Sequence, residues 1–220
     1  VDALTGPAMG RPKSATYRTL DVVGIDTFSH VAKTMRDNLP NDPWKQIFTL
    51  PNWLDALISK GALGQKSGSG IYKKVGREIH VLDLKTQNYV LSKPELDETV
   101  TEILKIKNPS EKLKKLRECH HDQAQFLWCI FRDLFHYCVV QLESIADNAR
   151  DLDFAVRWGY GWNMGPFEMW QASGWKEIRD AITDEITLGK TLAPTPFPAW
   201  ACESDRTGVH TEQGSFSGTR

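Results

Sequence analysis

Cysteine and histidine gather at one place in this chain, and these residue types could together bind a metal ion. Cys119, His120 and His121 are consecutive, and Cys129 follows on the same predicted helical stretch. Structural zinc sites use four ligands in pairs spaced by about two to five residues, a pattern that this cluster does not match. Adjacent histidines on a helix also point about 100° apart. We therefore interpret the cluster as the solvated start of a helix and assign no metal site.

Glycine-rich segments that could hold a phosphate group lie between residues 61 and 70. Gly61 to Ser67 contains a Lys-Ser step, but a phosphate-binding loop has glycine directly before the lysine, and here Gln65 intervenes. Gly68-Ser69-Gly70 lacks the third glycine of a dinucleotide-binding turn, and a strand rather than a helix is expected after it. We expect no cofactor-binding residue in this chain.

The remaining histidines offer no catalytic pair. They lie far apart in the sequence, without the neighbouring base or nucleophile that would make such a pair visible: His30, His80, His136 and His210. No catalytic residue is assigned.

Two Met-Gly turns have the residue types expected where a helix begins abruptly beside a ligand. Met9-Gly10-Arg11-Pro12 lies near the start of the chain, and Met164-Gly165-Pro166 lies in its last third. Glycine permits a sharp turn without a Cβ, and proline suits the first helical position. Each turn alone is equally typical of an ordinary helix N-terminus. Two of them, each followed by a segment that closes on a glycine, predict a duplicated unit.

The spacing of apolar residues predicts a mainly α-helical protein with one small β-hairpin. The longest expected helix, residues 122–148, is apolar over more than one face, as is typical of the centre of a bundle or of a subunit interface. Further helices are expected over residues 13–23, 27–39 and 51–60, and after Pro94 around residues 96–104 and 113–116; the hairpin is expected over residues 79–91.

These elements predict three parts. Residues 1–92 form a first helical repeat that lacks its earlier turns and ends in the hairpin, residues 93–202 form a second repeat, and residues 203–220 form a polar tail or linker. Tryptophans crowd the second repeat, where they are expected to fill the core or an interface: Trp158, Trp162, Trp170 and Trp175.

Composition limits the partners and the compartment. The net charge of −1 lacks the positive excess that binds nucleic acid or an anionic membrane surface. The 4 cysteines do not form a disulfide framework, and no apolar run approaches the roughly 20 residues that span a bilayer. These features predict a cytoplasmic protein.

Three phrases of the sequence together resemble one family. Gly10-Arg11-Pro12-Lys13-Ser14, residues 163–168 (Asn-Met-Gly-Pro-Phe-Glu) and residues 66–72 (Lys-Ser-Gly-Ser-Gly-Ile-Tyr) are similar to phrases of the two C-terminal repeats of long-chain bacterial 3-hydroxyacyl-CoA dehydrogenases. The resemblance covers roughly residues 1–180. It implies helical repeats of that C-terminal domain, and an NAD-dependent parent enzyme of fatty-acid β-oxidation.

The resemblance also implies which roles belong to this chain. In the family, NAD and the catalytic histidine and glutamate belong to a separate dinucleotide-binding domain, so this chain alone should bind no NAD and be inactive. Met9, Gly10 and Pro12 are placed beside the acyl chain of the acyl-CoA substrate, although Arg11 interrupts the family phrase. The Met164-Gly165-Pro166 turn is expected to be structural.

The same resemblance suggests partners. Residues 208–217 are similar to the approach to a crotonase-type enoyl-CoA hydratase domain in fused members of the family. The implied partners are the protein's own dinucleotide-binding domain, a crotonase-type domain and a second copy in a homodimer. The alternative function is a non-catalytic helical interaction module that keeps the fold without acyl-CoA chemistry.

Overall fold

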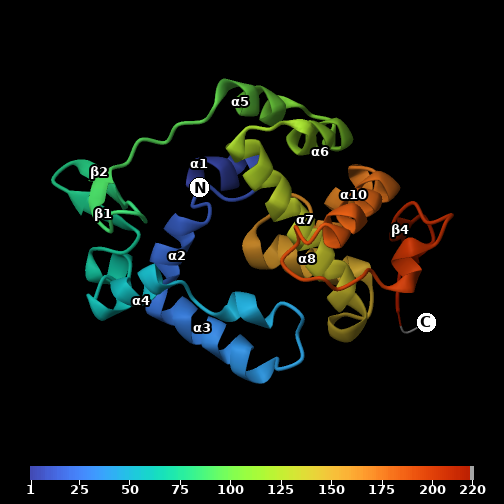
Figure 1. Cartoon of the computed structure of the whole chain (residues 1–220), viewed down its shortest axis with the longest axis horizontal. Helices are drawn as coiled ribbons and strands as arrows, with labels where there is room; N and C mark the ends of the chain where they lie inside the picture. The colour runs from blue at the N-terminus through green and yellow to red at the C-terminus, as the bar shows by residue number, and fades with distance from the viewer. Residues whose placement is uncertain (219–220) are drawn as a thin grey trace. The chain divides into compact units, whose positions relative to one another are not determined.

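The computed structural model describes residues 1–218 (Figure 1). The chain forms two compact units. Unit 1 comprises residues 1–6 and 13–95, and unit 2 comprises residues 7–12 together with the chain from Leu96 onward. Helices dominate both units, so the predicted mainly α-helical fold class is confirmed. None of the described helices combines the length and the apolar character that crossing a membrane would require.

Unit 1 consists of short helices and one antiparallel sheet. Its elements are α1 (Asp2–Thr5), α2 (Tyr17–Val23), α3 (Ile25–Asn38), the 3-10 helix η2 (Lys45–Phe48), α4 (Asn52–Ser59), the 3-10 helix η3 (Gln65–Ser67), β1 (Tyr72–Val75), β2 (Glu78–Leu82) and β3 (Tyr89–Leu91). The strands follow the order β1-β2-β3, with Tyr72 opposite Val81 and Leu82 opposite Tyr89. The predicted hairpin is thus part of a three-stranded sheet.

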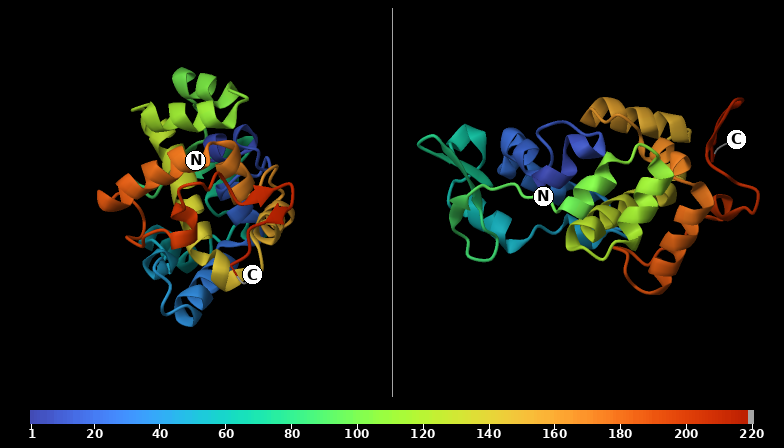
Figure 2. Two further views of the ribbon diagram at one scale, coloured as in Figure 1. Left: turned by 90° about the vertical axis from the view of Figure 1, so that its right-hand side faces the viewer. Right: turned by 90° about the horizontal axis from the view of Figure 1, so that it is seen from above.

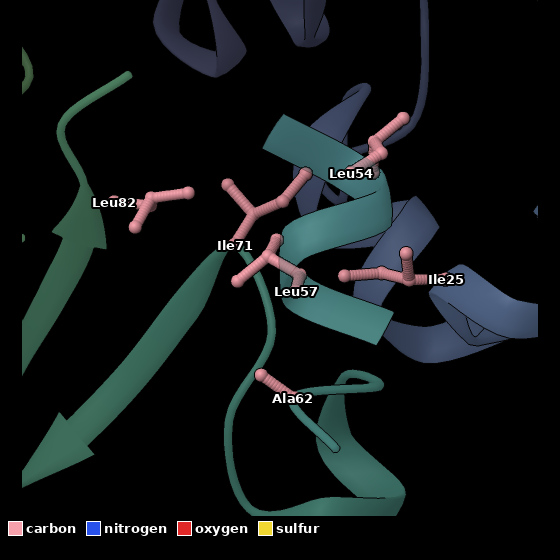
Figure 3. Packing of buried hydrophobic residues seen from close by; sticks show 6 residues of the cluster. All are labelled: Ile25, Leu54, Leu57, Ala62, Ile71 and Leu82. Atoms are coloured by element: carbon pink, nitrogen blue, oxygen red, sulfur yellow. The ribbon is translucent and has the colours of Figure 1, made fainter. Parts of the chain in front are cut away.

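One apolar cluster holds unit 1 together. Side chains from α3, α4 and the sheet meet there and are almost fully buried (Figure 3): Ile25, Leu54, Leu57, Ala62, Ile71 and Leu82. Burial of each larger aliphatic side chain contributes about 1.5–3 kcal/mol relative to its exposure. The cluster therefore stabilises the sheet against the helices.

Unit 2 is built around the long helix α7. Its elements are the 3-10 helix η1 (Pro7–Met9), α5 (Glu98–Lys105), α6 (Pro109–Glu118), α7 (Asp122–Ile145), α8 (Ala149–Tyr160), α9 (Pro166–Ala172), α10 (Trp175–Thr187), the 3-10 helix η4 (Ala199–Cys202), β4 (His210–Thr211) and β5 (Gly214–Ser215). Phe135 of α7 stacks on Trp170 at a centroid distance of 5.6 Å, and Trp170 stacks on Trp175 at 4.0 Å. As expected, both tryptophans fill the core. Trp158, in contrast, is 77% exposed and stacks on Phe154 of its own helix.

Each unit contains an aspartate that caps a short helix from outside. In unit 1 the Asp2 carboxylate accepts hydrogen bonds from the backbone N–H groups of Tyr17 (2.7 Å) and Arg18 (2.9 Å), at the start of α2. In unit 2 the Asp153 carboxylate accepts from Phe167 (2.8 Å) and Glu168 (3.0 Å), at the start of α9. These donors would otherwise lack partners, because the first turn of a helix has none within the helix.

The short helix is closed in the same way in both units. A glycine with positive φ, Gly24 at 102° and Gly174 at 96°, lies between the short helix (α2 or α9) and the longer helix (α3 or α10) and is the N-cap of the longer helix. Glycine adopts this backbone conformation without the steric cost that a Cβ adds. The two units therefore share a local plan of acid cap, short helix, glycine and longer helix.

A side chain of the short helix then fixes the closing strand. In unit 1 the Asp21 carboxylate accepts from the backbone N–H groups of Ile71 and Tyr72, at 2.8 and 2.7 Å. In unit 2 Gln171 Oε1 accepts from Val209 and His210, both at 2.9 Å. The equivalent contacts place residues 208–218 in the role that residues 70–82 have in unit 1.

The structure therefore differs from the expectation of a polar tail over residues 203–220. The strands β4 and β5 lie side by side in an antiparallel hairpin (Figure 2), and Val209 is only 2% exposed. Val209 and Phe216 are the apolar anchors of an otherwise polar segment, too few for a periodic pattern, so composition alone predicted a linker. The last two residues of the predicted tail lie outside the described residues.

Candidate functional site: a cavity with cationic side chains in unit 2

A cavity of about 280 Å³ lies within unit 2. Four segments line it: residues 7–11, the region around the start of α6, the middle of α7, and residues 162–169. The two Met-Gly turns meet at this cavity, because the backbone N–H of Asn163 donates a hydrogen bond to the carbonyl oxygen of Gly10 at 3.0 Å. Turns that are distant in the sequence thus form adjacent parts of one wall.

Both turn glycines are needed where they stand. Gly10 has φ +69°, and a Cβ there would lie 3.2 Å from the Asn163 side chain. Gly165 has an ordinary φ of −75°, but a Cβ there would lie 2.4 Å from atoms of Asp153. Glycine is therefore required at the N-cap of α9 because the Asp153 side chain lies too close for a Cβ, and not because of its backbone conformation.

The two turns do not start equivalent helices. Gly165 is the N-cap of α9, and Pro166 is the first residue of that helix. No helix begins directly after Met9 and Gly10, because the next helix, α2, starts at Tyr17. α2 begins only at Tyr17, with Thr16 as its N-cap, so the predicted helix over residues 13–23 is shorter than expected. Ala15 has a positive φ of 52°, which is incompatible with a continuous helix through this segment.

The predicted substrate-contacting residues are distributed unevenly around the cavity. Met9, which is 8% exposed, and Gly10 line it. Pro12 is exposed and is not among the lining residues; it lies instead beside Gly161, where a Cβ would come within 3.4 Å of the proline ring. Met164, Gly165 and Pro166, expected to be structural, line the cavity as well.

Apolar and sulfur-containing side chains form much of the lining. They come from η1, α6, α7 and the segment before and within α9: Met9, Leu113, Phe131, Leu134, Phe135, Met164 and Met169. Methionine is flexible and polarisable, so it adapts to apolar ligands of different shape. Such a wall suits a hydrocarbon chain.

Among the residues that the structure describes, three cations and no acidic side chain line the same cavity; the cations are Arg11, Lys107 and Lys112. The Arg11 guanidinium lies 4.0 Å from the centre of the Trp162 ring, and burial lowers the pKa of Arg11 to about 10. Burial also lowers the pKa of Lys112. In the sequence, Arg11 is a departure from a family phrase, and Lys112 lies in a charged stretch that is typical of a solvated helix face. No local pattern shows that they share a cavity.

A second polar cluster in unit 2 has the residue types of a hydrolase triad. Ser215 Oγ lies 3.0 Å from His210 Nδ1, and His210 Nε2 lies 2.8 Å from Asp153 Oδ2. Asp153 also caps α9, and Ser215 Oγ accepts the backbone N–H of Arg150 at 3.0 Å. The contact of His210 with Asp153 corresponds to a contact in unit 1, where the Tyr72 hydroxyl donates a hydrogen bond to Asp2. We interpret the cluster as a clamp that fixes the closing hairpin.

The candidate metal cluster resolves into a helix cap. His121 is the N-cap of α7, and its Nδ1 accepts the backbone N–H of Gln123 at 3.2 Å. Cys119 is the C-cap of α6, and Cys129 lies within α7. The interpretation of these residues as a helix start therefore agrees with the observed geometry.

Comparison with known proteins identifies the family of the first part of the chain. Residues 1–74 match the family model of the 3-hydroxyacyl-CoA dehydrogenase C-terminal domain. These residues belong to that family. The resemblance predicted from the three sequence phrases is confirmed.

Relatives of the 3-hydroxyacyl-CoA dehydrogenase family extend the similarity beyond residue 74. The "Probable 3-hydroxyacyl-CoA dehydrogenase" of Bacillus subtilis is 41% identical over 182 residues, which cover 83% of this chain and 23% of that protein. A Deinococcus radiodurans protein of the same name is 49% identical over 78 residues, or 36% of this chain and 22% of its own length.

A more distant relative is named as a fatty acid oxidation complex trifunctional enzyme. This protein, from Rickettsia prowazekii, is 23% identical over 209 residues, or 90% of this chain and 27% of its own length. The chain thus spans about a quarter of the length of the curated relatives that it matches.

Proposed function

We propose that this chain is the C-terminal helical part of an NAD-dependent 3-hydroxyacyl-CoA dehydrogenase of fatty-acid β-oxidation, and that it shapes the cleft for the acyl chain. The observation that supports this most strongly is the family match of residues 1–74, extended by a relative that is 41% identical over 182 residues. The cavity in unit 2 adds a surface of suitable chemistry, because its methionine and aromatic side chains fit a hydrocarbon.

In this proposal the chemistry of hydride transfer belongs to another domain of the full-length enzyme. Gly68-Ser69-Gly70 leads into β1 of an antiparallel sheet, whereas a dinucleotide-binding turn leads from a parallel strand into a helix. The proposed partners are that dinucleotide-binding domain, the acyl-CoA substrate, a crotonase-type domain and a second copy of the protein. The name of the Rickettsia relative, a trifunctional enzyme, is consistent with further domains.

Activity measurements test whether hydride transfer requires the dinucleotide-binding domain. The 220-residue chain alone should form no NADH from 3-hydroxyacyl-CoA and NAD, whereas a protein that joins it to a dinucleotide-binding domain should. Turnover by the chain alone would contradict the proposal. Inactivity of the joined protein despite a folded dinucleotide domain would instead favour a non-catalytic helical interaction module.

A pair of variants in the joined protein tests the role of the cavity. Met9→Ala removes an apolar group from the cavity wall and should raise KM for long-chain substrates by at least about 5-fold, since such contacts are worth about 1–3 kcal/mol. Pro12→Ala, at an exposed position outside the lining, should leave KM unchanged. Equal effects of the two substitutions, or an effect that is the same for short-chain substrates, would exclude the cavity as an acyl site.

A further inference from the structure

We propose that the cavity of unit 2 is an anion site as well as an apolar one, and that Arg11, Lys107 and Lys112 bind a phosphate group attached to a hydrocarbon tail. The inference names the head group for the cavity that the proposed function assigns to an acyl chain, and in that respect it rests on the proposed function.

The argument begins with uncompensated positive charge. Lys105 pairs with Glu102 and Lys115 pairs with Glu111, whereas no ion pair among the described residues includes Arg11, Lys107 or Lys112. Arg11 and Lys112 are nevertheless half-buried, and this burial lowers the pKa of both side chains. Removing a cation from water without a counter-charge costs free energy, and an anionic ligand would offset that cost.

Arg11 is held in place by a neighbouring aromatic ring. Its guanidinium lies over Trp162, an interaction that orients the planar group and leaves its N–H donors available at the edge. Arginine in this state suits the oxygens of a phosphate, to which it can donate two parallel hydrogen bonds.

Helix α6 adds to the positive potential at the cavity. Its first residue, Pro109, lines the cavity together with Lys112 one turn later. The N-terminal end of a helix carries a partial positive charge that favours nearby anions. Arg11, Lys112 and this helix end therefore all favour a negatively charged group in the cavity. The apolar lining indicates that the ligand also carries an apolar part and is not a small hydrated anion alone.

Binding of decyl phosphate to the 220-residue chain, measured by isothermal titration calorimetry below the micelle concentration, tests the proposal. Decyl phosphate should bind more tightly than decanol, and Arg11→Gln and Lys112→Gln should each weaken its binding by about tenfold or more, because hydrogen bonds to charged groups are worth about 1.5–3 kcal/mol. Arg11→Lys should retain part of the affinity. Lys114→Gln, an exposed control on α6 outside the cavity, should change it by less than about twofold.

Several outcomes would overturn the proposal: no binding of decyl phosphate, equal binding of decanol, or equal losses in Lys112→Gln and Lys114→Gln. Competition by decanoyl-CoA identifies the source of the phosphate. Displacement by the CoA thioester points to the substrate, and failure to displace points to a phosphorylated lipid; either result supports phosphate recognition. Because binding is measured without turnover, an inactive enzyme that still binds decyl phosphate would refute only the proposed function.

Discussion

A single buried carboxylate, Asp153, ties three segments of unit 2 together. The side chain is fully buried, caps α9 and accepts from His210 in the closing hairpin. In sequence it is one acid of an ordinary amphipathic helix. Its role depends on partners that lie more than a dozen residues away along the chain.

Asp153→Asn should lower the free energy of unfolding by about 2–3 kcal/mol, because an amide presents a donor to N–H groups that need an acceptor, and the hydrogen bonds lost are charge-assisted. Urea denaturation followed by circular dichroism measures this. Asp184→Asn, at an exposed position of α10, is the control and should cost less than about 0.5 kcal/mol. Similar losses in the two variants would show that Asp153 is not the cap described here.

His136, a buried residue of α7, should make the stability of the protein depend on pH. Its Nε2 lies 2.7 Å from the carbonyl oxygen of Thr195, and burial lowers its pKa, with Asp133 opposing and Arg132 adding to the shift. A histidine whose folded pKa is lowered binds its proton more readily when unfolded. Stability should therefore be full above the unfolded pKa of about 6.5 and should decrease as the pH falls through it.

The measurement is the free energy of unfolding between about pH 7.5 and about pH 5. His136→Gln should reduce the pH dependence over this range, whereas His30→Gln, at an exposed position in unit 1, should leave it as in the parent chain. An unchanged slope in His136→Gln would refute the assignment.

At the scale of elements, the junction of α8 and α9 shows why one glycine is required and another is not. A Cβ at Gly165 would overlap Asp153 at 2.4 Å, while a Cβ at Gly159, within α8, would meet nothing within 4 Å. The two residues lie six positions apart in the same local sequence. Only the packing distinguishes them.

The matched substitutions should change stability in opposite directions. Gly165→Ala should destabilise by about 1–3 kcal/mol, the usual cost of overpacking a tight contact. Gly159→Ala should stabilise by up to about 1 kcal/mol, because alanine is the better helix former. Thermal unfolding of both variants gives the comparison, and a destabilising Gly159→Ala or a neutral Gly165→Ala would contradict the described geometry.

At the scale of the whole molecule, residues 208–218 pack against the rest of unit 2. Phe216 stacks on Trp200 at a centroid distance of 4.2 Å, and Gln171 binds two backbone N–H groups of this segment. These contacts complete unit 2 as the sheet completes unit 1. The segment is therefore part of the fold.

Truncation after Ser204 should lower the free energy of unfolding by at least about 3 kcal/mol, because it removes the buried Val209 and leaves the acceptors of Gln171 and Asp153 without their partners. Tryptophan emission should shift to longer wavelength as Trp200 becomes exposed. A truncated chain with the melting temperature and emission of the parent would restore the interpretation as a polar tail.

The amino-acid sequence by itself determined the helical character of the chain, the approximate extent of α3, α4 and α7, and the resemblance to the 3-hydroxyacyl-CoA dehydrogenase family. These features are local: a period of apolar residues or a short phrase is complete within the segment that contains it. The duplicated plan was also indicated by the sequence, although through the Met-Gly turns, which prove not to begin equivalent helices.

Only the tertiary structure decided what the turns and charges do. It brought Met9 and Gly10 to Asn163, placed Arg11 and Lys112 at one cavity, left Pro12 outside it, and used residues 208–218 to close unit 2. Each of these results depends on contacts between residues far apart in the chain, including single hydrogen bonds and close approaches at a glycine. Such contacts arise from how whole elements pack, and no local periodicity encodes them.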